Sequence, residues 1–227
     1  MRRFMMIMKK LCLNVVLGAL CCTPSLFSGE PTALVENAKA NASRNVALNV
    51  DGADFPKATS NSVYHDMAIF AAKNVINGRN ENKGHGGPFP SWGPHLIDDL
   101  WLKIDFGKEV EIDKMVIYIR ADFTPYTKSD HDSWWKSGIL EFSDGSKLPF
   151  KLKRTADAQV IPFPKRQVSW VKFTKLIRAE DIWCAFSEVE FWGKVVTESD
   201  HFLQFFEHFV YLRLVAFLIL SVCAQIN

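Results

Sequence analysis

The sequence predicts an all-β domain, built as an antiparallel β-sandwich. Short runs of strand character recur at roughly regular spacing, turn signals such as Ser143-Asp144-Gly145 separate them, and helical periodicity is nearly absent. Closely spaced short strands with little helix are typical of sandwiches. The predicted strands cover residues 45–50, 100–106, 114–120, 138–142, 148–152, 159–163, 168–174 and 186–192.

The two central strands differ in the burial that their patterns indicate. Apolar and charged residues alternate over residues 102–106, which is the period of a strand with one buried face. Residues 114–120 are nearly all apolar and rich in β-branched and aromatic types, as in a strand covered on both faces. We expect a turn at Gly107 between these strands and a polar rim from Arg120 onward.

Two long polar segments, residues 80–94 and 121–136, flank the central strands. Segments of this length without regular structure are often functional in compact domains. Before the first of them, residues 68–75 fit one or two helical turns, which Asn77-Gly78 would end in a left-handed turn. The candidate binding loops therefore lie on either side of the central strands.

Residues 1–29 have the order of a secretory signal, with basic residues first, then an apolar stretch and then small residues. We therefore expect an exported protein, which is secreted, periplasmic or part of the cell envelope. Residues 30–44 are interpreted as a linker to a domain at residues 45–194. A lipid anchor on Cys21 or Cys22 is an alternative fate of the leader.

The charge and the cysteines restrict the partners and the covalent structure. Loss of the leader removes Arg2, Arg3, Lys9 and Lys10 and turns the formal net charge from +2 to −2. No basic run remains, so nucleic acid is not an expected partner. Three of the five cysteines lie in the leader, and Cys184 and Cys223 do not form a disulfide framework. Cys184 is expected to be a small buried apolar residue.

Residues 195–227 form an apolar tail, for which the sequence leaves several structures open. The uncharged run 214–224 would span only about 16 Å as a helix, short of the ~30 Å hydrocarbon core. Extension back to Phe202 supplies the length but includes Arg213. Apolar residues at three-to-four spacing also fit an amphipathic helix. The tail is expected to be a membrane anchor, a docking helix or a poorly ordered extension.

Several short motifs occur in a fixed order along residues 45–194. They are Asn45-Val46-Ala47-Leu48, residues 72–78 ending in Ile76-Asn77-Gly78, Trp92, residues 100–108 with Trp101-Leu102 and Asp105-Phe106-Gly107, residues 112–118, Phe142-Ser143-Asp144-Gly145 and residues 187–193. In this order they resemble the galactose-binding-like jelly roll of the discoidin or coagulation factor type C family, which includes many carbohydrate-binding modules. The resemblance implies a jelly-roll sandwich that binds its ligand in the loops at one end.

The resemblance also implies a structural calcium ion. In many members, the loop that corresponds to residues 74–82 and a Glu near the closing strand bind this ion. The matching residues are Asn77 and Glu188. Calcium prefers oxygen ligands, which carboxylates, amides and backbone carbonyls supply. The family's usual Asp is Asn77 here, which removes a charge and should weaken the site.

Ligands in the family bind near this calcium loop and near the end of the strand that matches residues 114–120. A sugar needs an aromatic face for the apolar side of its ring and fixed polar groups for its hydroxyls. The candidate ligand-binding residues are Arg120, Trp92, His95, Asp122, Phe123, His131, Asp132, Trp134 and Trp135. The other tryptophans lie in or beside predicted strands and are expected in the core: Trp101, Trp170, Trp183 and Trp192.

The sequence thus predicts a non-catalytic, exported binding module with carbohydrate as its ligand. It has no nucleophile elbow, phosphate-binding glycine loop or zinc-binding helix, and acidic pairs such as Asp98-Asp99 are too common to indicate a glycosidase. An adhesion or envelope-assembly domain that binds protein or lipid headgroups is the first alternative. A small hydrolase is the second, and it would require a loop pocket with carboxylates that face each other.

Overall fold

The computed structural model describes residues 42–81, 90–120, 133–180, 183–198 and 200. The predicted signal segment, nearly all of the apolar tail and four candidate ligand-binding residues lie outside the described residues. These four residues are Asp122, Phe123, His131 and Asp132. Among the described residues, no helix has the length and apolar character that a membrane span requires.

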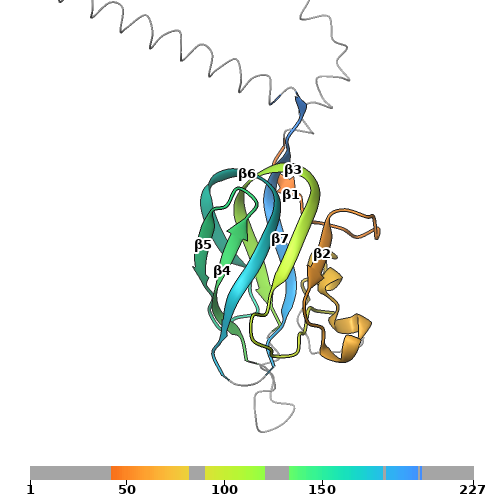
Figure 1. The fold of residues 1–227 in the computed structure, drawn as a ribbon, viewed down its shortest axis with the longest axis vertical. Coiled ribbons are helices and arrows are strands. Elements are labelled where there is room, and N and C mark those ends of the chain that lie inside the picture. Colours follow the sequence, from red (N-terminus) through yellow and green to blue (C-terminus); the bar gives the residue numbers. More distant parts are fainter. Residues whose placement is uncertain (1–41, 82–89, 121–132, 181–182, 199, 201–227) are drawn as a thin grey trace, which may run out of the picture. The chain divides into compact units, whose positions relative to one another are not determined.

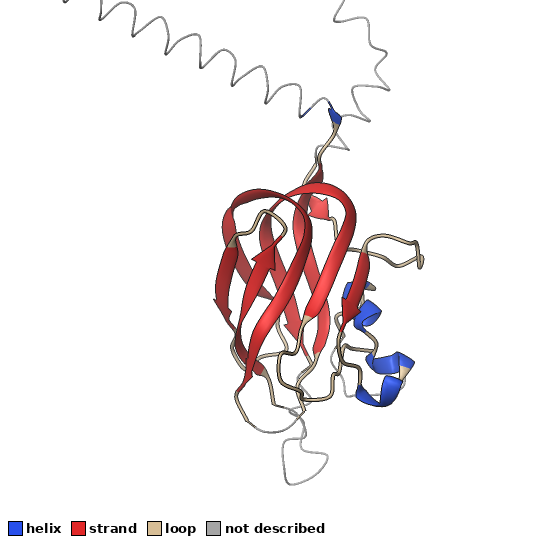
Figure 2. Ribbon diagram, viewed as in Figure 1, coloured by secondary structure: helices blue, strands red, loops and turns tan. Residues whose placement is uncertain are grey.

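The named elements are β-strands and short 3-10 helices (Figures 1 and 2). The strands are β1 (Arg44–Asn45), β2 (Lys57–Ser60), β3 (Leu102–Ile119), β4 (Trp135–Phe142), β5 (Lys147–Lys151), β6 (Gln159–Arg178) and β7 (Phe186–Val195). The helices are η1 (Tyr64–Asp66), η2 (Ala68–Phe70) and η3 (Ala72–Ile76). Every strand pair is antiparallel, so the predicted all-β antiparallel class is confirmed.

One hydrogen-bonded sheet makes both layers of the sandwich. Its strand order is β1-β7-β3-β6-β4-β5, with β2 paired to β3. β3 and β6 run side by side and bend over together at one end of the molecule (Figure 1). The two halves of each strand therefore lie in opposite layers. Strands that are not hydrogen-bonded neighbours consequently meet across the core, as when the ring of Trp135 in β4 lies 6.3 Å from that of Phe186 in β7.

The sequence predicted breaks in β3 and β6 that the structure does not contain. Gly107 lies within β3 at a φ of +71°, where the register against β6 shifts between Asp105 and Val110. The expected turn is therefore a bend inside one strand, because the irregular pairing takes up the extra residues while the ladder continues. β6 likewise joins the two segments predicted at residues 159–163 and 168–174.

Two other boundaries also differ from the prediction. β1 ends at Asn45 instead of continuing to residue 50, and the side chain of Val50 is 61% exposed. β4 begins at Trp135, which the sequence placed in a loop. The predicted helical turns before Asn77 are confirmed as η2 and η3, and Gly78 follows at a φ of +78°, in the expected left-handed conformation.

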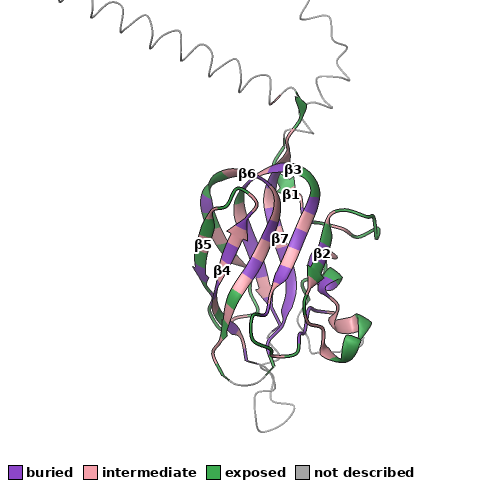
Figure 3. Ribbon diagram, in the orientation of Figure 1, coloured by how far each residue is buried: buried purple, intermediate pink, exposed green. Residues whose placement is uncertain are grey.

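Buried residues recur along the strands (Figure 3). They form a core between the two layers, built mainly from phenylalanine and branched aliphatic side chains. Five phenylalanines are among its largest fully buried side chains: Phe106, Phe142, Phe173, Phe186 and Phe191. Their rings pack edge-on or tilted, as aromatic rings prefer. Cys184 is buried among the core residues, as predicted.

The tryptophans divide between core and surface in the opposite way from the prediction. Trp92 and Trp135 are buried, whereas the four tryptophans expected in the core are not. Trp101, Trp170 and Trp192 are half-buried, and Trp183 is exposed. The first three lie beneath lysine ammonium groups, with Lys172 over Trp101, Lys103 over Trp170 and Lys114 over Trp192 at 4.7–5.2 Å from the ring centroids. These rings therefore face outward in cation–π pairs.

Asn74 holds the 3-10 segment against the sandwich. Its side chain is buried, and its amide donates to the carbonyl groups of Ala68, Ile69 and Ser91 at 2.8–3.1 Å. A buried amide needs such partners, because an unsatisfied donor would be costly. The bond to Ser91 ties η2 and η3 to the segment that precedes Trp92.

Candidate functional site

The end of the sandwich opposite the bend of β3 and β6 gathers several chain segments, and we call it the loop end. Backbone hydrogen bonds fix it: the Arg120 N–H donates to the carbonyl of Ala185 at 3.0 Å. Trp92 and Phe186 exchange two further backbone bonds at 2.9 and 3.1 Å. The end of β3, the start of β7 and the segment around Trp92 are therefore held together.

Trp92 and Trp135 form the floor of the loop end rather than its surface. Their rings are stacked at a centroid distance of 6.5 Å, and they are 0% and 2% exposed. The indole N–H of Trp92 is directed to the Oγ of Ser60 and the carbonyl of Ser62, at 3.1 and 3.2 Å. These contacts make Trp92 a core residue that links β2 to β7.

The loop end also carries a cluster of rings that we call the Tyr64 cluster. It consists of Tyr64, His65, Phe70, His95 and Trp183. The ring of Tyr64 is central, with centroid distances of 4.2–5.8 Å to the other four. His65, His95 and Trp183 are exposed, so the cluster presents both aromatic and imidazole groups to solvent.

The two histidines are joined by a hydrogen bond that fixes one imidazole. The backbone N–H of His65 donates to Nε2 of His95 at 3.1 Å. Because Nε2 accepts, the neutral ring of His95 carries its proton on Nδ1, which is then a hydrogen-bond donor. The backbone of His65 has a φ of +48°, a conformation that residues other than glycine seldom adopt. The segment is thus held in an unusual geometry that brings both imidazoles together.

Arg120 lies beneath the cluster. Its side chain is 4% exposed, its Nη1 is 3.4 Å from the Oγ of Ser91, and its guanidinium lies 5.8 Å from the ring centroid of Phe70. A group this deeply buried supports the rings above it and fixes the position of Phe70. Among the described residues, Arg120 and His95 are the predicted site residues that the structure brings to the Tyr64 cluster.

One further candidate among the described residues, Trp134, does not belong to the Tyr64 cluster. Trp134 is half-buried, packs against the core and has the guanidinium of Arg154 at 5.8 Å from its ring centroid. The four candidates in residues 121–132 lie outside the described residues, so their roles stay predictions.

Sequence reasoning missed Tyr64, His65, Phe70 and Trp183 as site residues. Tyr64 and His65 precede a segment in which the sequence showed only helical character, and Trp183 was assigned to the core. The available signal was the pair Tyr64-His65 in a polar stretch. It could not be joined to Trp183, more than a hundred residues later, without the fold.

The predicted calcium ligands occupy a second, buried location beside η3. Glu188 is 1% exposed, and its Oε1 accepts the N–H of Gly78 at 3.1 Å. Its Oε2 is buried and has no hydrogen-bond partner among the described residues. The Oδ1 of Asn77 accepts the N–H of Arg79 at 2.8 Å and keeps a second lone pair.

Burial raises the pKa of Glu188 to about 9, and the nearby charge of Glu190 acts in the same direction. The backbone N–H groups of residues 77–79 oppose this shift. A cation beside the partnerless Oε2 would instead favour the ionised carboxylate. The described residues hold no cluster of three or more His, Cys, Asp or Glu, so backbone and amide oxygens would have to complete such a site. The donor set fits a weak calcium site and no stronger one.

Comparisons with known proteins agree on the architecture. No protein-family model matches the sequence, and no curated protein matches it. Among solved structures, a fucolectin from the serum of striped bass (Morone saxatilis) matches 68% of this chain and 48% of its own, at 15% identity and a TM-score of 0.50. The lectin binding domain of Lectinolysin, solved as a histidine mutant complexed with Lewis b, matches 67% of this chain and 97% of its own at 15% identity and a TM-score of 0.50.

A chitosan-binding module from a chitosanase/glucanase of Paenibacillus sp. IK-5 matches 66% of this chain and 99% of its own, at 17% identity and a TM-score of 0.47. At such identities a likeness reports the course of the chain. The chain therefore has the galactose-binding-like jelly-roll fold, which is also the fold of carbohydrate-binding modules and F-lectins.

Proposed function

We propose that the domain is a non-catalytic carbohydrate-binding module and that the Tyr64 cluster is its ligand site. The observation that carries this proposal is the cluster itself. Five rings gather at the loop end, and the exposed ones are the imidazoles of His65 and His95 and the indole of Trp183, a large aromatic group that would normally gain from burial. The fold is one that lectins use, which supports the choice of ligand.

The cluster offers the two kinds of contact that a sugar needs. The exposed ring of Trp183 supplies an apolar face for the C–H groups of a pyranose, with Tyr64 packed edge-on against it at 4.4 Å. The Nδ1–H of His95 supplies a donor for a hydroxyl or ring oxygen. Arg120 acts from below as a positioning residue. No step in this arrangement requires a nucleophile or a general acid.

A glycan array probed with the full-length chain tests the proposal. Wild-type protein should be retained on a subset of glycans, and Tyr64→Ala and His95→Ala should each lose that retention while keeping the wild-type melting temperature within a few degrees. Phe55 serves as a matched control. Its side chain is 50% exposed, and it precedes β2, whereas Tyr64 follows β2. Retention by neither wild type nor the Phe55→Ala control would count against sugar binding and favour a protein or lipid partner.

The calcium ion belongs to the same proposal. Glu188 and Asn77 would hold it, with carbonyl oxygens of the Asn77 loop, and its role would be to neutralise a buried carboxylate and stiffen the segment behind the Tyr64 cluster. Export is likewise proposed, from the order of residues in the leader. Membrane association through the apolar tail would add a second means of attachment.

A further inference from the structure

A second concave surface lies beside β6. Its loop wall, residues 96–101, directly follows His95 of the Tyr64 cluster in the sequence. The surface is a groove of about 480 Å³ between residues 96–101 and the strands β4 and β6. β6 continues to Arg178, whereas its pairing with β3 stops where Phe173 meets Leu102. The segment before Leu102 diverges from β6, and the groove fills the space between them.

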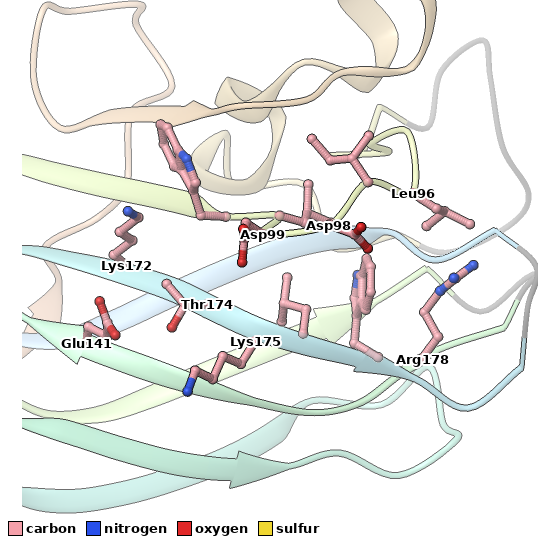
Figure 4. A pocket seen from close by; sticks show the side chains of 13 residues that line it. Leu96, Asp98, Asp99, Glu141, Lys172, Thr174, Lys175 and Arg178 are labelled. Atoms are coloured by element: carbon pink, nitrogen blue, oxygen red, sulfur yellow. The ribbon is translucent and has the colours of Figure 1, made fainter.

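The loop wall of the groove is acidic, whereas the strand wall carries charges of both signs. Figure 4 shows Asp98 and Asp99 on the loop side, and Lys172, Thr174 and Lys175 on the side of β6. The half-buried ring of Trp101 belongs to the loop wall, with the Nζ of Lys172 4.8 Å from its centroid. The groove thus combines an aromatic ring with hydrogen-bonding groups on both sides.

Trp135 gives the groove a donor that has no acceptor. The side chain lines the groove although it is only 2% exposed, and its indole N–H is buried without a hydrogen-bond partner among the described residues. Leaving a buried donor unpaired costs on the order of 1–3 kcal/mol. An oxygen of a bound molecule would recover this cost.

We propose that this groove is a second saccharide-binding subsite, separate from the Tyr64 cluster. A saccharide has acceptor oxygens for the N–H of Trp135, hydroxyl donors for Asp98 and Asp99, and an apolar ring face for Trp101. The walls are too polar for an apolar ligand and too mixed in charge for a polyanion. The subsite stands on its own residues and does not depend on the Tyr64 cluster being occupied.

Glu141, one of the carboxylates of the groove, does not suit the acid role in glycoside hydrolysis. Glycoside hydrolysis needs one carboxyl group that holds its proton near neutral pH. Glu141, which also lines the groove, has its pKa lowered by the hydrogen bond from Lys147 at 2.7 Å, so it is ionised. The second alternative from the sequence, a small hydrolase, would require the release of reducing ends from a bound oligosaccharide.

Calorimetric titration of the full-length chain with cellohexaose, laminarihexaose and chitohexaose tests the subsite. Trp135→Phe removes the N–H and keeps most of the ring. The double variant Asp98→Asn and Asp99→Asn removes both charges, and Asn tolerates the positive φ of 53° at position 99. Each should weaken the binding of at least one hexasaccharide about tenfold, while the Phe55→Ala control leaves that binding unchanged.

The outcomes separate this subsite from the proposed loop-end site. Binding that the groove variants weaken and Phe55→Ala does not weaken supports the subsite, even if Tyr64→Ala shows no loss of retention on the glycan array. Wild-type affinity in both groove variants, absence of binding to all three hexasaccharides, or release of reducing ends would overturn it. If Trp135→Phe does not fold, the double Asn variant decides alone.

Discussion

Glu188 couples the stability of the domain to pH. Its pKa of about 9 in the folded protein lies above the ordinary value of 4.5, so the folded state keeps a proton that the unfolded chain releases. The resulting stabilisation is complete below pH 4.5 and is lost as the pH rises toward 9. In the absence of calcium, the free energy of unfolding should fall over this interval, by at most about 1.4 kcal/mol per pH unit.

Glu188→Gln isolates this effect, because the amide keeps an acceptor for the N–H of Gly78 and cannot titrate. Urea unfolding in a chelator should show a decline with pH in the wild type and a flatter profile in the variant. Calcium should raise the melting temperature of the wild type most at high pH, where it meets the ionised carboxylate, and should leave the variant unaffected. An equal calcium effect on both proteins would place the ion elsewhere.

Trp92 and Trp183 should respond differently to truncation. Trp92→Ala removes a fully buried ring and its two hydrogen bonds, and should cost about 3–5 kcal/mol of unfolding free energy. Trp183→Ala removes an exposed ring and should cost less than about 1 kcal/mol. Urea unfolding measures both values. Comparable losses would mean that Trp183 is a structural residue and not a ligand contact.

The tryptophans differ in whether they face the core or the solvent, and this difference could not be predicted from single residues. A tryptophan in a strand faces either the core or the solvent, and strand composition alone does not say which. Trp101 and Trp170 could not be recognised as outward-facing, because the lysines that cover them come from the neighbouring strand. Cys184 was predicted correctly, because a small thiol between apolar neighbours has few other roles.

At the scale of elements, the sequence predicted the positions of most strands but not their continuity. The polar and glycine-containing stretch at residues 107–109 has the composition of a turn, yet at Val110 the pairing of β3 with β6 resumes and its pairing with β7 begins. The same ambiguity arises at Pro162 and Pro164 within β6. A bend that both strands share preserves their pairing, and this cooperation between distant segments leaves no local signal.

Gly193 tests the close approach of β7 to β3. A Cβ at this position would clash with the backbone carbonyl of Glu111 and with the Cα of Ile112, which cannot move without breaking the ladder. Gly193→Ala should therefore cost about 3 kcal/mol of unfolding free energy. Gly52→Ala is the control: its φ of +69° costs about 1 kcal/mol, and no atom lies near the added methyl group.

Equal losses of unfolding free energy in Gly193→Ala and Gly52→Ala would show that β7 packs less tightly against β3 than the structure indicates. Chemical denaturation followed by tryptophan fluorescence separates the two cases, because Trp92 and Trp135 report on the shared core.

At the scale of the whole molecule, the fold could be predicted and the site only in part. Ordered motifs along residues 45–194 indicated the jelly roll, because they encode turns and core positions. The Tyr64 cluster combines residues that lie between positions 64 and 183 of the sequence. The groove forms because β6 extends beyond Phe173, the last of its residues that pairs with β3. Such features depend on how segments are placed, and His95 and Arg120 were foreseen only because strand ends are usual places for function.

The two proposed sites would give the domain different ways to hold a glycan. The Tyr64 cluster presents exposed rings at the loop end, whereas the groove lies between residues 96–101 and the strands β4 and β6. Leu96, which lines the groove, directly follows His95 of the cluster, so the two proposed sites adjoin in the sequence.

The most direct measurement of the central claim is a calorimetric titration of the full-length chain with the glycan retained most strongly on the array. Trp183→Ala should weaken binding about tenfold or more, as the loss of a stacking ring predicts, and Phe55→Ala should bind as the wild type does. Unchanged affinity in Trp183→Ala, or an equal loss in Phe55→Ala, would contradict the assignment of the Tyr64 cluster as the ligand site.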